Sequence, residues 1–430
     1  MREYSYEEAI EFFKNLPHFV PPVNNCGGTK SLFSLDAENA LLEKLDNPHM
    51  DLKYIHVAGT NGKGSTSAFI ATILKEANYK VGCFTSPFLF AYNEMYKVNG
   101  QDISNEEFAR IFSIVKPYYD QLASDGIYPS EYEILTVMSF LYFKDMDCDI
   151  VVMEVSMGGR VDTTNVIPAP LVSVITPISF DHMSILGNTL TEIATEKAGI
   201  IKTGTIVVSA KQEPEVVEVL AQVCKEKNVE LHFASEPVVV SRNLKGQEFM
   251  VAEFGSRLST QLLGTYQVKN AALAMKTVEQ LKRQGFIISD EALRTGLNNT
   301  NWFGRFSVIK NNPPVIVDGG HNRQGAAVLA DSLRTYFPEK KITFVLGILK
   351  DKEVEIMLDE LLPLAKEVFT VEVPNPRTMS ADELAERIIL RGVKAQAFTG
   401  DDVLELESDA DVICMAGSLY LFSSLFSADS

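Results

Sequence analysis

The stretch IHVAGTNGKGSTSAFI, Ile55 to Ile70, places three glycines and a lysine between a short apolar run and an apolar segment of helical character. Glycines let the backbone approach an anion closely, and the N-terminus of a following helix adds partial positive charge. The stretch departs from the strict phosphate-loop pattern, because Val57 stands at the first glycine position and Gly64 follows the lysine. It still predicts a nucleotide site, formed by Gly59, Thr60, Asn61, Gly62, Lys63, Gly64 and Ser65.

The surrounding sequence predicts a parallel sheet. A strand before the loop, a helix over about 65–77 and the next apolar run, KVGCFTS, form a βαβ unit. The runs DIVVMEVS, LVSVIT and GTIVVSA are continuously apolar, which is typical of strands covered by helices on both faces. Further helices are predicted over 6–16, from an N-cap at Asp36, over 104–123 and over 131–143, and an antiparallel hairpin within 238–263.

A polar stretch, NNTNWFGRF, separates two α/β segments. After it, apolar strands alternate with helices again, from PVIVDGG to DVICMAGS. We therefore predict an α/β protein of two domains: residues 1–301, with a mostly parallel sheet of the phosphate-loop type, and residues 302–430, a smaller Rossmann-like domain.

Composition excludes several classes of protein. With a formal net charge of -18 over 430 residues, the chain lacks the basic surplus of a nucleic-acid or anionic-membrane binder. No uncharged apolar run approaches the ~20 residues of a membrane span, and the N-terminus has no secretory signal pattern. The five cysteines are scattered, which indicates reduced, mostly buried thiols. We expect a cytoplasmic enzyme.

Polar residues follow several predicted strands. Glu154 ends one strand, and Arg160, Asp162 and Asn165 lie on the same rim, where open α/β sheets bind ligands. Asp181 and His182 follow the next strand. A hydroxyl, the Glu154 carboxylate and the His182 imidazole, together with ATP oxygens and water, would form a credible set of Mg²⁺ ligands. In the second segment, Asp318 to His321 join a strand to a helix, and Arg305 at the boundary could neutralise a transferring phosphate. Lys197 ends a helix, where the simplest expectation is a side chain facing water.

These motifs together resemble the folylpolyglutamate synthase/dihydrofolate synthase family, relatives of the Mur peptide ligases. The resemblance spans nearly the whole chain and includes VAGTNGKGS, TSPF, EVSMGGRVDTTN, SFDHMSILGNT, EKAGI, FGRF and DGGHN. It implies ATP-dependent addition of L-glutamate to dihydropteroate, to folyl(poly)glutamate, or to both, through an acyl phosphate. We expect a monomer, because no apolar surface segment stands out in the sequence, and no nucleic-acid or membrane partner.

The resemblance also implies roles for individual residues. Lys63, His182 and Lys197 would be catalytic, and Lys197 would be carbamylated. Two Mg²⁺ sites would use Ser86, Glu154, His182 and Lys197. Further ATP contacts would come from Asn270, Arg305, Asp318 and His321. The folate or pteroate end would lie near the loop NNCGGTKSL and near Thr85, Pro87, Ser130, Tyr132, Glu133, Arg160, Asp162 and Thr164.

Several positions depart from the family pattern: Met95, Ser156, Tyr266, Ser307 and Arg323 stand where Arg, Gly, His, Glu and Pro are usual. Three alternative functions fit the sequence less well. A Mur-type ligase for a UDP-linked sugar acid disagrees with TSPF and GGRVDTTN, and a GTPase switch would need Asn-Lys-x-Asp, which is missing from the sequence. A catalytically inactive folate-binding module disagrees with the retained Glu154, His182 and Lys197.

Overall fold

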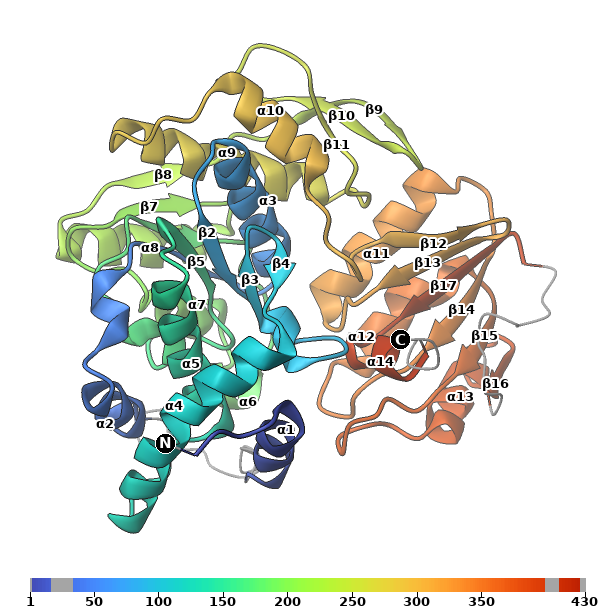
Figure 1. Ribbon diagram of the computed structural model, residues 1–430. Helices are drawn as coiled ribbons and strands as arrows, with labels where there is room; N and C mark the ends of the chain where they lie inside the picture. The colour runs from blue at the N-terminus through green and yellow to red at the C-terminus, as the bar shows by residue number, and fades with distance from the viewer. Residues whose placement is uncertain (1, 17–33, 399–409, 426–430) are drawn as a thin grey trace. The chain divides into compact units, whose positions relative to one another are not determined.

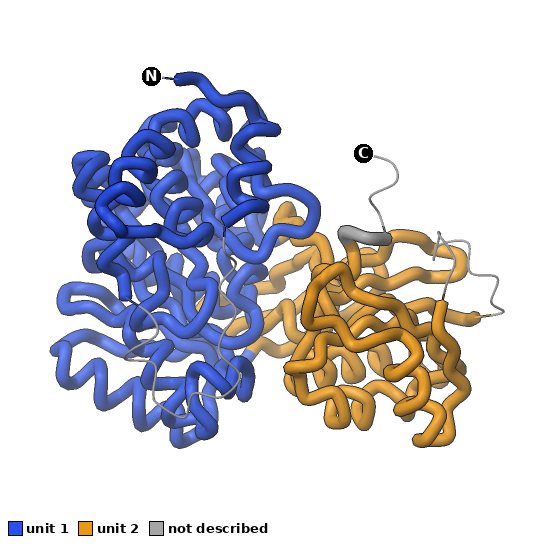
Figure 2. The backbone as a smooth tube through the Cα atoms, turned by 90° about the horizontal axis from the view of Figure 1, so that it is seen from below, with its two compact units in different colours: residues 1–236, 270–297 blue, residues 237–269, 298–430 orange. Residues whose placement is uncertain are grey.

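The protein is described by a computed structural model that covers residues 2–16, 34–398 and 410–425 (Figure 1). The chain forms two compact units, coloured separately in Figure 2. Unit 1 comprises residues 1–236 and 270–297, and unit 2 comprises residues 237–269 and 298–430. The segment 237–269, which the predicted boundaries assign to the first domain, thus belongs to unit 2. The domain limits 1–301 and 302–430 stay a prediction.

Unit 1 is built on a mostly parallel sheet whose order is β4-β3-β2-β5-β1-β6-β7-β8. Strands β2, β5, β1, β6, β7 and β8 run parallel, and β3 and β4 add an antiparallel margin. The central strands are buried along their length because their side chains are apolar on both faces. The strand bounds are β1 Tyr54–Ala58, β2 Val81–Phe84, β3 Tyr96–Val98, β4 Gln101–Asp102, β5 Ile150–Glu154, β6 Val172–Ile175, β7 Ile206–Ser209 and β8 Leu231–Phe233.

Helices pack around this sheet, as Figure 1 shows. Their bounds are α1 Tyr6–Asn15, α2 Asp36–Lys44, α3 Lys63–Glu76, α4 Asn105–Ser124, α5 Glu131–Asp145, α6 Met183–Leu186, α7 Leu190–Ala198, α8 Pro214–Lys227, α9 Gln267–Arg283 and α10 Asp290–Asn299. One predicted helix start was wrong: Asp36 is the first helical residue of α2 and not its N-cap. Helix α3 begins at Lys63, two residues before the predicted start near Ser65, and its N-cap Gly62 has a left-handed conformation.

Unit 2 contains two sheets. The smaller one, in the order β11-β10-β9, is antiparallel and contains the predicted hairpin with one further strand. The larger one has the order β12-β13-β17-β14-β15-β16 and is parallel except at β12. The strand bounds are β9 Val238–Asn243, β10 Gly246–Met250, β11 Leu258–Thr260, β12 Ser307–Asn311, β13 Pro314–Asp318, β14 Ile342–Leu346, β15 Ala365–Thr370, β16 Ala395–Ala397 and β17 Val412–Ala416.

The larger sheet of unit 2 and the helices around it form an apolar core. Its helices are α11 Arg323–Tyr336, α12 Val354–Leu361, α13 Ala381–Ile389 and α14 Tyr420–Leu425. The mixed α/β class with mostly parallel sheets, predicted from the alternation of apolar strands and helices, is confirmed.

Two further expectations concern cysteines and membranes. Cys83, Cys148, Cys224 and Cys414 are buried free thiols, as expected, and Cys26 lies outside the described residues. Within the described ranges, every helix is too short or too polar to cross a bilayer.

Candidate active site

The strand order of unit 1 gathers the predicted site residues at one sheet edge. β5 lies between β2 and β1, and β6 follows β1 on the other side. In the register of these parallel strands, Glu154 pairs with Val57, and Phe84 pairs with Met153. The carboxyl ends of the strands therefore present Ser86, Glu154, the glycine-rich loop and the segment after Ile175 next to one another.

The loop after β1 has the tight geometry that its glycines allow. Gly59 has φ 147° and Gly62 has φ 87°, backbone conformations that other L-residues rarely adopt. A Cβ atom on Gly59 would lie 1.9 Å from Thr176 Oγ1, and one on Gly62 would lie 2.6 Å from Asn270 Oδ1. Asn270, predicted to contact ATP, is thus brought against the loop within unit 1.

The loop is also tied to the segment that follows β6. The amides of Thr60 and Asn61 donate to the carbonyl of Pro177, at 3.0 and 3.3 Å. The Thr60 hydroxyl donates to Ser179 O and accepts from Ser179 N, both at 3.0 Å. A hydrogen-bonded loop of fixed shape needs little further ordering when an anion binds, which suits a phosphate site.

Lys197 does not face water as expected from its place at a helix end. It is only 4% exposed, and its Nζ donates to Gly59 O at 2.8 Å, directly beneath the loop. Burial, reinforced by the charge of Lys63, lowers the pKa of Lys197 to about 7. A large part of this amine is therefore neutral near neutral pH, and the expectation of a solvated lysine was wrong.

Two glycines place Lys197 by letting α7 approach the loop GGRVDTTN closely. A Cβ on Gly159 would lie 2.9 Å from Glu196 O and Lys197 O. A Cβ on Gly199 would lie 2.4 Å from the Cα of Arg160. The Arg160 amide donates to Glu196 O at 2.8 Å, and its guanidinium pairs with the Glu196 carboxylate at 2.9 Å. Arg160, predicted to bind substrate, thus also anchors the helix that carries Lys197.

The hydroxyls of α3 point inward. Ser65 is 1% exposed and Thr66 is fully buried, and the Thr66 hydroxyl has no hydrogen-bond partner among the described residues. Lys63 begins the helix, with its Nζ 3.2 Å from Thr60 O, and Gly64 lies in the first turn. The loop therefore offers backbone amides and a lysine, while its hydroxyls are held against the protein interior.

The predicted metal ligands form a compatible but incomplete donor set. Glu154 is buried at the end of β5, and Ser86 follows β2 on the neighbouring strand. His182 lies on the loop before α6 with φ 50°, its Nε2 3.9 Å from Asp181 Oδ1. No group of three or more His, Cys, Asp or Glu side chains in the described ranges is arranged to hold a metal ion. A hydroxyl and a carboxylate are hard oxygen donors that suit Mg²⁺ once phosphate oxygens and water complete the shell.

The stretch SEYE links the predicted substrate residues. Ser130 and Glu133 form a capping box at the start of α5, so both side chains bond to backbone amides there. Between them, the Tyr132 hydroxyl donates to Ser86 Oγ at 3.1 Å. Thr85 is buried, Pro87 is exposed, and the predicted loop NNCGGTKSL, residues 24–32, lies outside the described residues.

A buried polar chain crosses from this stretch to β1. Asp162 accepts hydrogen bonds from Met157 N at 2.9 Å and from the Thr164 hydroxyl at 2.5 Å. The Thr164 hydroxyl lies 2.8 Å from Nε2 of His56, which is fully buried. Burial raises the pKa of Asp162 and lowers that of His56 to about 3. The sequence did not indicate His56, although a histidine inside an apolar strand is an unusual residue there.

In unit 2, Arg305, Asp318 and His321 are brought together. Asp318 ends β13 and is 3% exposed, and its carboxylate accepts from Phe306 N, from Gly320 N and from the Tyr266 hydroxyl at 2.8 to 2.9 Å. Burial raises the pKa of Asp318, although the charge of Arg305 opposes this. A Cβ on Gly319 would lie 2.4 Å from Arg305 Nη1, so the guanidinium lies against this turn.

Residues that depart from the family pattern have partners of their own in unit 2. Tyr266 is the hydroxyl donor to Asp318, and Arg323 pairs with Glu353 at 2.8 Å. His321 Nδ1 lies 2.9 Å from Gly319 O. The sequence did not indicate the bond between Tyr266 and Asp318, because the two residues are 52 positions apart in the chain.

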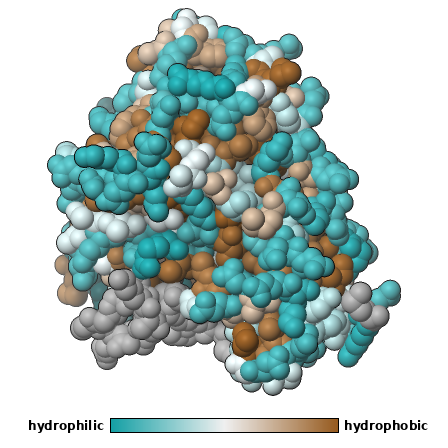
Figure 3. All heavy atoms as spheres, turned by 90° about the vertical axis from the view of Figure 1, so that its left-hand side faces the viewer, coloured by the Kyte–Doolittle hydropathy of each residue, from teal (hydrophilic) through white to brown (hydrophobic). Residues whose placement is uncertain are grey.

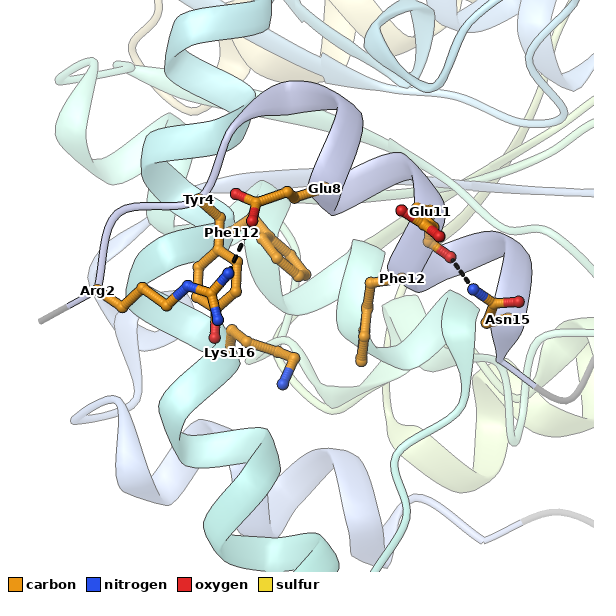
Figure 4. A pocket seen from close by; sticks show the side chains of 8 residues that line it. All are labelled: Arg2, Tyr4, Glu8, Glu11, Phe12, Asn15, Phe112 and Lys116. Atoms are coloured by element: carbon orange, nitrogen blue, oxygen red, sulfur yellow. Dashed lines mark hydrogen bonds and ion pairs between the residues drawn. The ribbon is translucent and has the colours of Figure 1, made fainter.

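A separate surface pocket lies between α1 and α4 (Figure 4). It contains none of the predicted site residues. Both of its cationic side chains are paired: Arg2 with Glu8 at 2.7 Å, and Lys116 with Asp120 at 2.6 Å. The Lys116 ammonium also lies 5.1 Å from the ring centre of Phe12, so this cation stabilises the packing of α1.

Comparison with known proteins agrees with this geometry. The Mur ligase middle domain matches residues 57–278, and the Mur ligase, glutamate ligase domain matches residues 304–419. The chain is 37% identical to the dihydrofolate synthase/folylpolyglutamate synthase of Bacillus subtilis, over 90% of this chain and 92% of that protein. It is 32% identical to the folylpolyglutamate synthase of Lacticaseibacillus casei, over 98% of both.

Solved structures give the same result. The folylpolyglutamate synthase of Thermotoga maritima aligns with a TM-score of 0.82 at 31% identity, over 97% of this chain and 95% of that one. The Mycobacterium tuberculosis folylpolyglutamate synthase, solved in complex with ADP and AMPPCP, aligns with a TM-score of 0.83 at 31% identity, over 91% and 94%. These similarities extend over nearly the whole chain and agree with the phosphate loop and the buried lysine beneath it. The chain therefore belongs to the folylpolyglutamate synthase/dihydrofolate synthase family of Mur-type, ATP-dependent ligases.

Proposed function

We propose that this protein joins L-glutamate to the carboxyl group of dihydropteroate, of a folyl(poly)glutamate, or of both, with hydrolysis of ATP to ADP and phosphate. The observation that carries the proposal is Lys197, buried beneath a glycine-rich phosphate loop in a chain of this family. The names of the relatives support the substrate class, and one similar structure, at 28% identity and a TM-score of 0.82, is a complex with AMPPCP and folate.

The reaction has two steps. A carboxylate oxygen of the pteroate or folate attacks the γ-phosphorus of ATP, and ADP leaves with the electron pair of the broken P–O bond. The glutamate amine then attacks the acyl carbon, loses a proton and expels phosphate through a tetrahedral intermediate. The loop amides and Lys63 orient and neutralise the phosphates, which is the main contribution a protein makes to phosphoryl transfer.

We propose Mg²⁺ at the sheet edge, held by Ser86, Glu154 and His182 together with phosphate oxygens. When bound, the metal supplies positive charge that stabilises the transferring phosphoryl group. Carbamylation of Lys197 would add a carboxylate to these ligands, and we propose that a second Mg²⁺ ion binds there. A neutral Lys197 amine adds to CO₂ with release of a proton, which gives a carboxylate on the lysine, and the pKa of about 7 leaves enough neutral amine for this addition.

For the remaining predicted residues, we propose the roles that the family resemblance implies. Asn270, beside Gly62, would contact the nucleotide at the phosphate loop. Arg305, Asp318 and His321 keep the ATP-contact role that the family resemblance implies. Thr85, Pro87, Ser130, Tyr132, Glu133, Arg160, Asp162 and Thr164 would line the pteroate or folate site. We also propose a monomer in the cytoplasm. The exposed large apolar side chains of the described residues come from many separate segments, and Figure 3 shows one face of the molecule.

An assay of ADP release tests the proposal. The wild-type protein is given ATP, Mg²⁺ and L-glutamate with dihydropteroate, with tetrahydrofolate, or with a UDP-linked sugar acid. We expect release with one or both pterin substrates and none with the sugar acid. If ADP is released with the sugar acid and not with either pterin substrate, the proposal is wrong, and the protein is a Mur-type ligase of peptidoglycan precursors.

The variant Lys63→Ala tests the phosphate loop. Removing the charge that faces the β- and γ-phosphates should lower kcat by about 100-fold or more, as measured by ADP release at saturating substrates. Lys75→Ala, in the last turn of the same helix and exposed, is the matched control and should retain activity. Near-normal ADP formation by Lys63→Ala would contradict the assigned loop.

A further inference from the structure

Glu38 is a carboxyl group without a hydrogen-bond partner. It lies in the first turn of α2, it is fully buried, and neither of its carboxyl oxygens is hydrogen-bonded within the described part of the chain. Buried polar side chains almost always have partners, and leaving a carboxyl group without one costs several kcal/mol if it is ionised. Among the described residues of unit 1, Glu38 is thus a buried acid with both carboxyl oxygens unpaired.

Two more carboxyl groups lie beside it. Desolvation is the main cause that raises the pKa of Glu38 well above its usual value, and the charges of Glu133 and Asp162 raise it further. Glu133 and Asp162 both accept hydrogen bonds from backbone amides, so their positions are set by the protein. Glu38 is the member of this acidic cluster whose acceptor atoms are not used by the protein itself.

The cluster lies among residues of the proposed pteroate or folate site. Glu133 follows Tyr132 on α5, and Asp162 bonds to Thr164. A metal ion is a poor candidate, because the described residues contain no group of three His, Cys, Asp or Glu side chains arranged to bind one. The unpaired carboxyl group of Glu38 would instead bind a ligand that supplies N–H donors.

Of the proposed substrates, the pterin ring is the better complement. Its 2-amino group and N3–H are adjacent, coplanar donors that match the two oxygens of one carboxylate. Hydrogen bonds to the charged form favour it, so these donors would offset the desolvation that favours the protonated form of Glu38 in the free protein. Zwitterionic glutamate would bring its own carboxylates toward three buried acids, which electrostatic repulsion opposes. A neutral ring can be buried beside an apolar core at lower cost than a charged amino acid.

We propose that Glu38 is a specificity-determining residue of the substrate site, which accepts the paired N–H donors of the 2-amino-4-oxo pteridine ring. This inference rests on the proposed function. It names a residue that the sequence motifs did not indicate, in a helix with no other predicted site residue.

The test combines a variant with a substrate analogue. The isosteric Glu38→Gln variant and the wild type are assayed with the pterin substrate that the wild type turns over, and with the analogue that carries a methyl group in place of the 2-amino group. Glu38→Gln should raise KM for the parent substrate about tenfold or more, the effect of one charged hydrogen bond. The same substitution should change KM for the analogue by less than about threefold, since the analogue has lost a donor to the carboxylate.

Controls separate this role from a structural one. Glu43→Gln, exposed on the same helix, should leave KM unchanged. An equal rise in KM for both substrates overturns the proposal. No rise in KM together with a raised unfolding temperature also overturns it, since that is the result expected if Glu38 is only an unpaired buried acid whose removal stabilises the fold. A selective rise in KM for glutamate also overturns it.

Two further measurements keep the outcomes distinct. Calorimetric binding of dihydropteroate and of its analogue to wild type and variant needs no turnover, so it tests Glu38 even if the proposed reaction is wrong. If Glu38→Gln does not fold, the wild type decides alone: it should bind the 2-methyl analogue about tenfold or more weakly than the parent. Equal binding of the two ligands contradicts the proposal.

Discussion

Burial controls the charge of the basic residues near the phosphate loop. Lys197 and His56 are both enclosed, and desolvation lowers the pKa of each because the charged form loses its hydration. For Lys197, the result is a pKa of about 7, so that a large part of the amine is neutral near neutral pH. For His56, the result is a neutral imidazole that keeps its hydrogen bond to Thr164.

His56 predicts a pH dependence of stability. Its pKa is about 3 in the folded protein, against the ordinary histidine value of 6.5 in the unfolded chain, so the unfolded chain takes up a proton first as the pH falls. The contribution of His56 is complete above pH 6.5 and is lost progressively below it. Between pH 7.5 and pH 4.5, the free energy of unfolding of the wild type should fall by about 2 to 3 kcal/mol more than that of His56→Gln. Denaturant unfolding at both pH values measures this, and parallel pH profiles of the two proteins would refute it.

At the level of elements, the site depends on how closely α7 packs on the loop that follows β5. Gly199 has φ -59°, an ordinary helical value, so its role is to provide space and not backbone freedom. The space is filled by the backbone of Arg160, which any side chain at position 199 would contact. The motifs GGR and EKAG are thus two halves of one packing arrangement.

The variant Gly199→Ala tests this arrangement. Its Cβ would lie 2.4 Å from Arg160 Cα, so α7 must shift and carry Lys197 away from Gly59 O. We expect a loss of kcat of about tenfold or more, since displacements of about 1 Å in an active site have such effects, and a loss of stability of about 1–3 kcal/mol. The control is Gly126→Ala, where the added methyl meets open space and only the positive φ is strained. Normal activity of Gly199→Ala would show that Lys197 needs no such placement.

At the level of the whole molecule, each unit carries residues that are proposed to contact the nucleotide. Unit 1 carries the phosphate loop, Lys197 and Asn270, and unit 2 carries Arg305 and Asp318. A ligand that binds the folded protein and not the unfolded chain stabilises it by mass action.

MgATP should therefore protect the protein against heat. At a nucleotide concentration 100 times Kd, the stabilisation should be about 2.7 kcal/mol, seen as an upward shift of the unfolding transition. Removing the metal with EDTA should reduce this shift, and Lys63→Ala should lose most of it. A shift that is the same with and without metal would argue against the proposed ligands Ser86 and Glu154.

Much of the fold and of the chemistry could be predicted from local sequence. Continuously apolar runs predicted the buried parallel strands, and the glycines around Lys63 predicted the loop, because both depend on neighbours in the chain. The family and its ligase activity, inferred from ordered motifs, are confirmed. The environment of Lys197 was not predictable from its neighbours in the chain, since its Nζ bonds to Gly59 O, 138 positions away.

The sequence by itself determined which segments form strands, where the backbone bends sharply and which reactive groups the chain carries, since these follow from side chains and glycines close in the chain. Only the tertiary structure decided the strand order that sets Ser86, Glu154 and the phosphate loop side by side. It also decided which groups lose their water: Lys197, His56 and Glu38 are all buried in the assembled fold. Burial is a property of the assembled fold, and burial sets the charge, the pairing and therefore the chemistry of these residues.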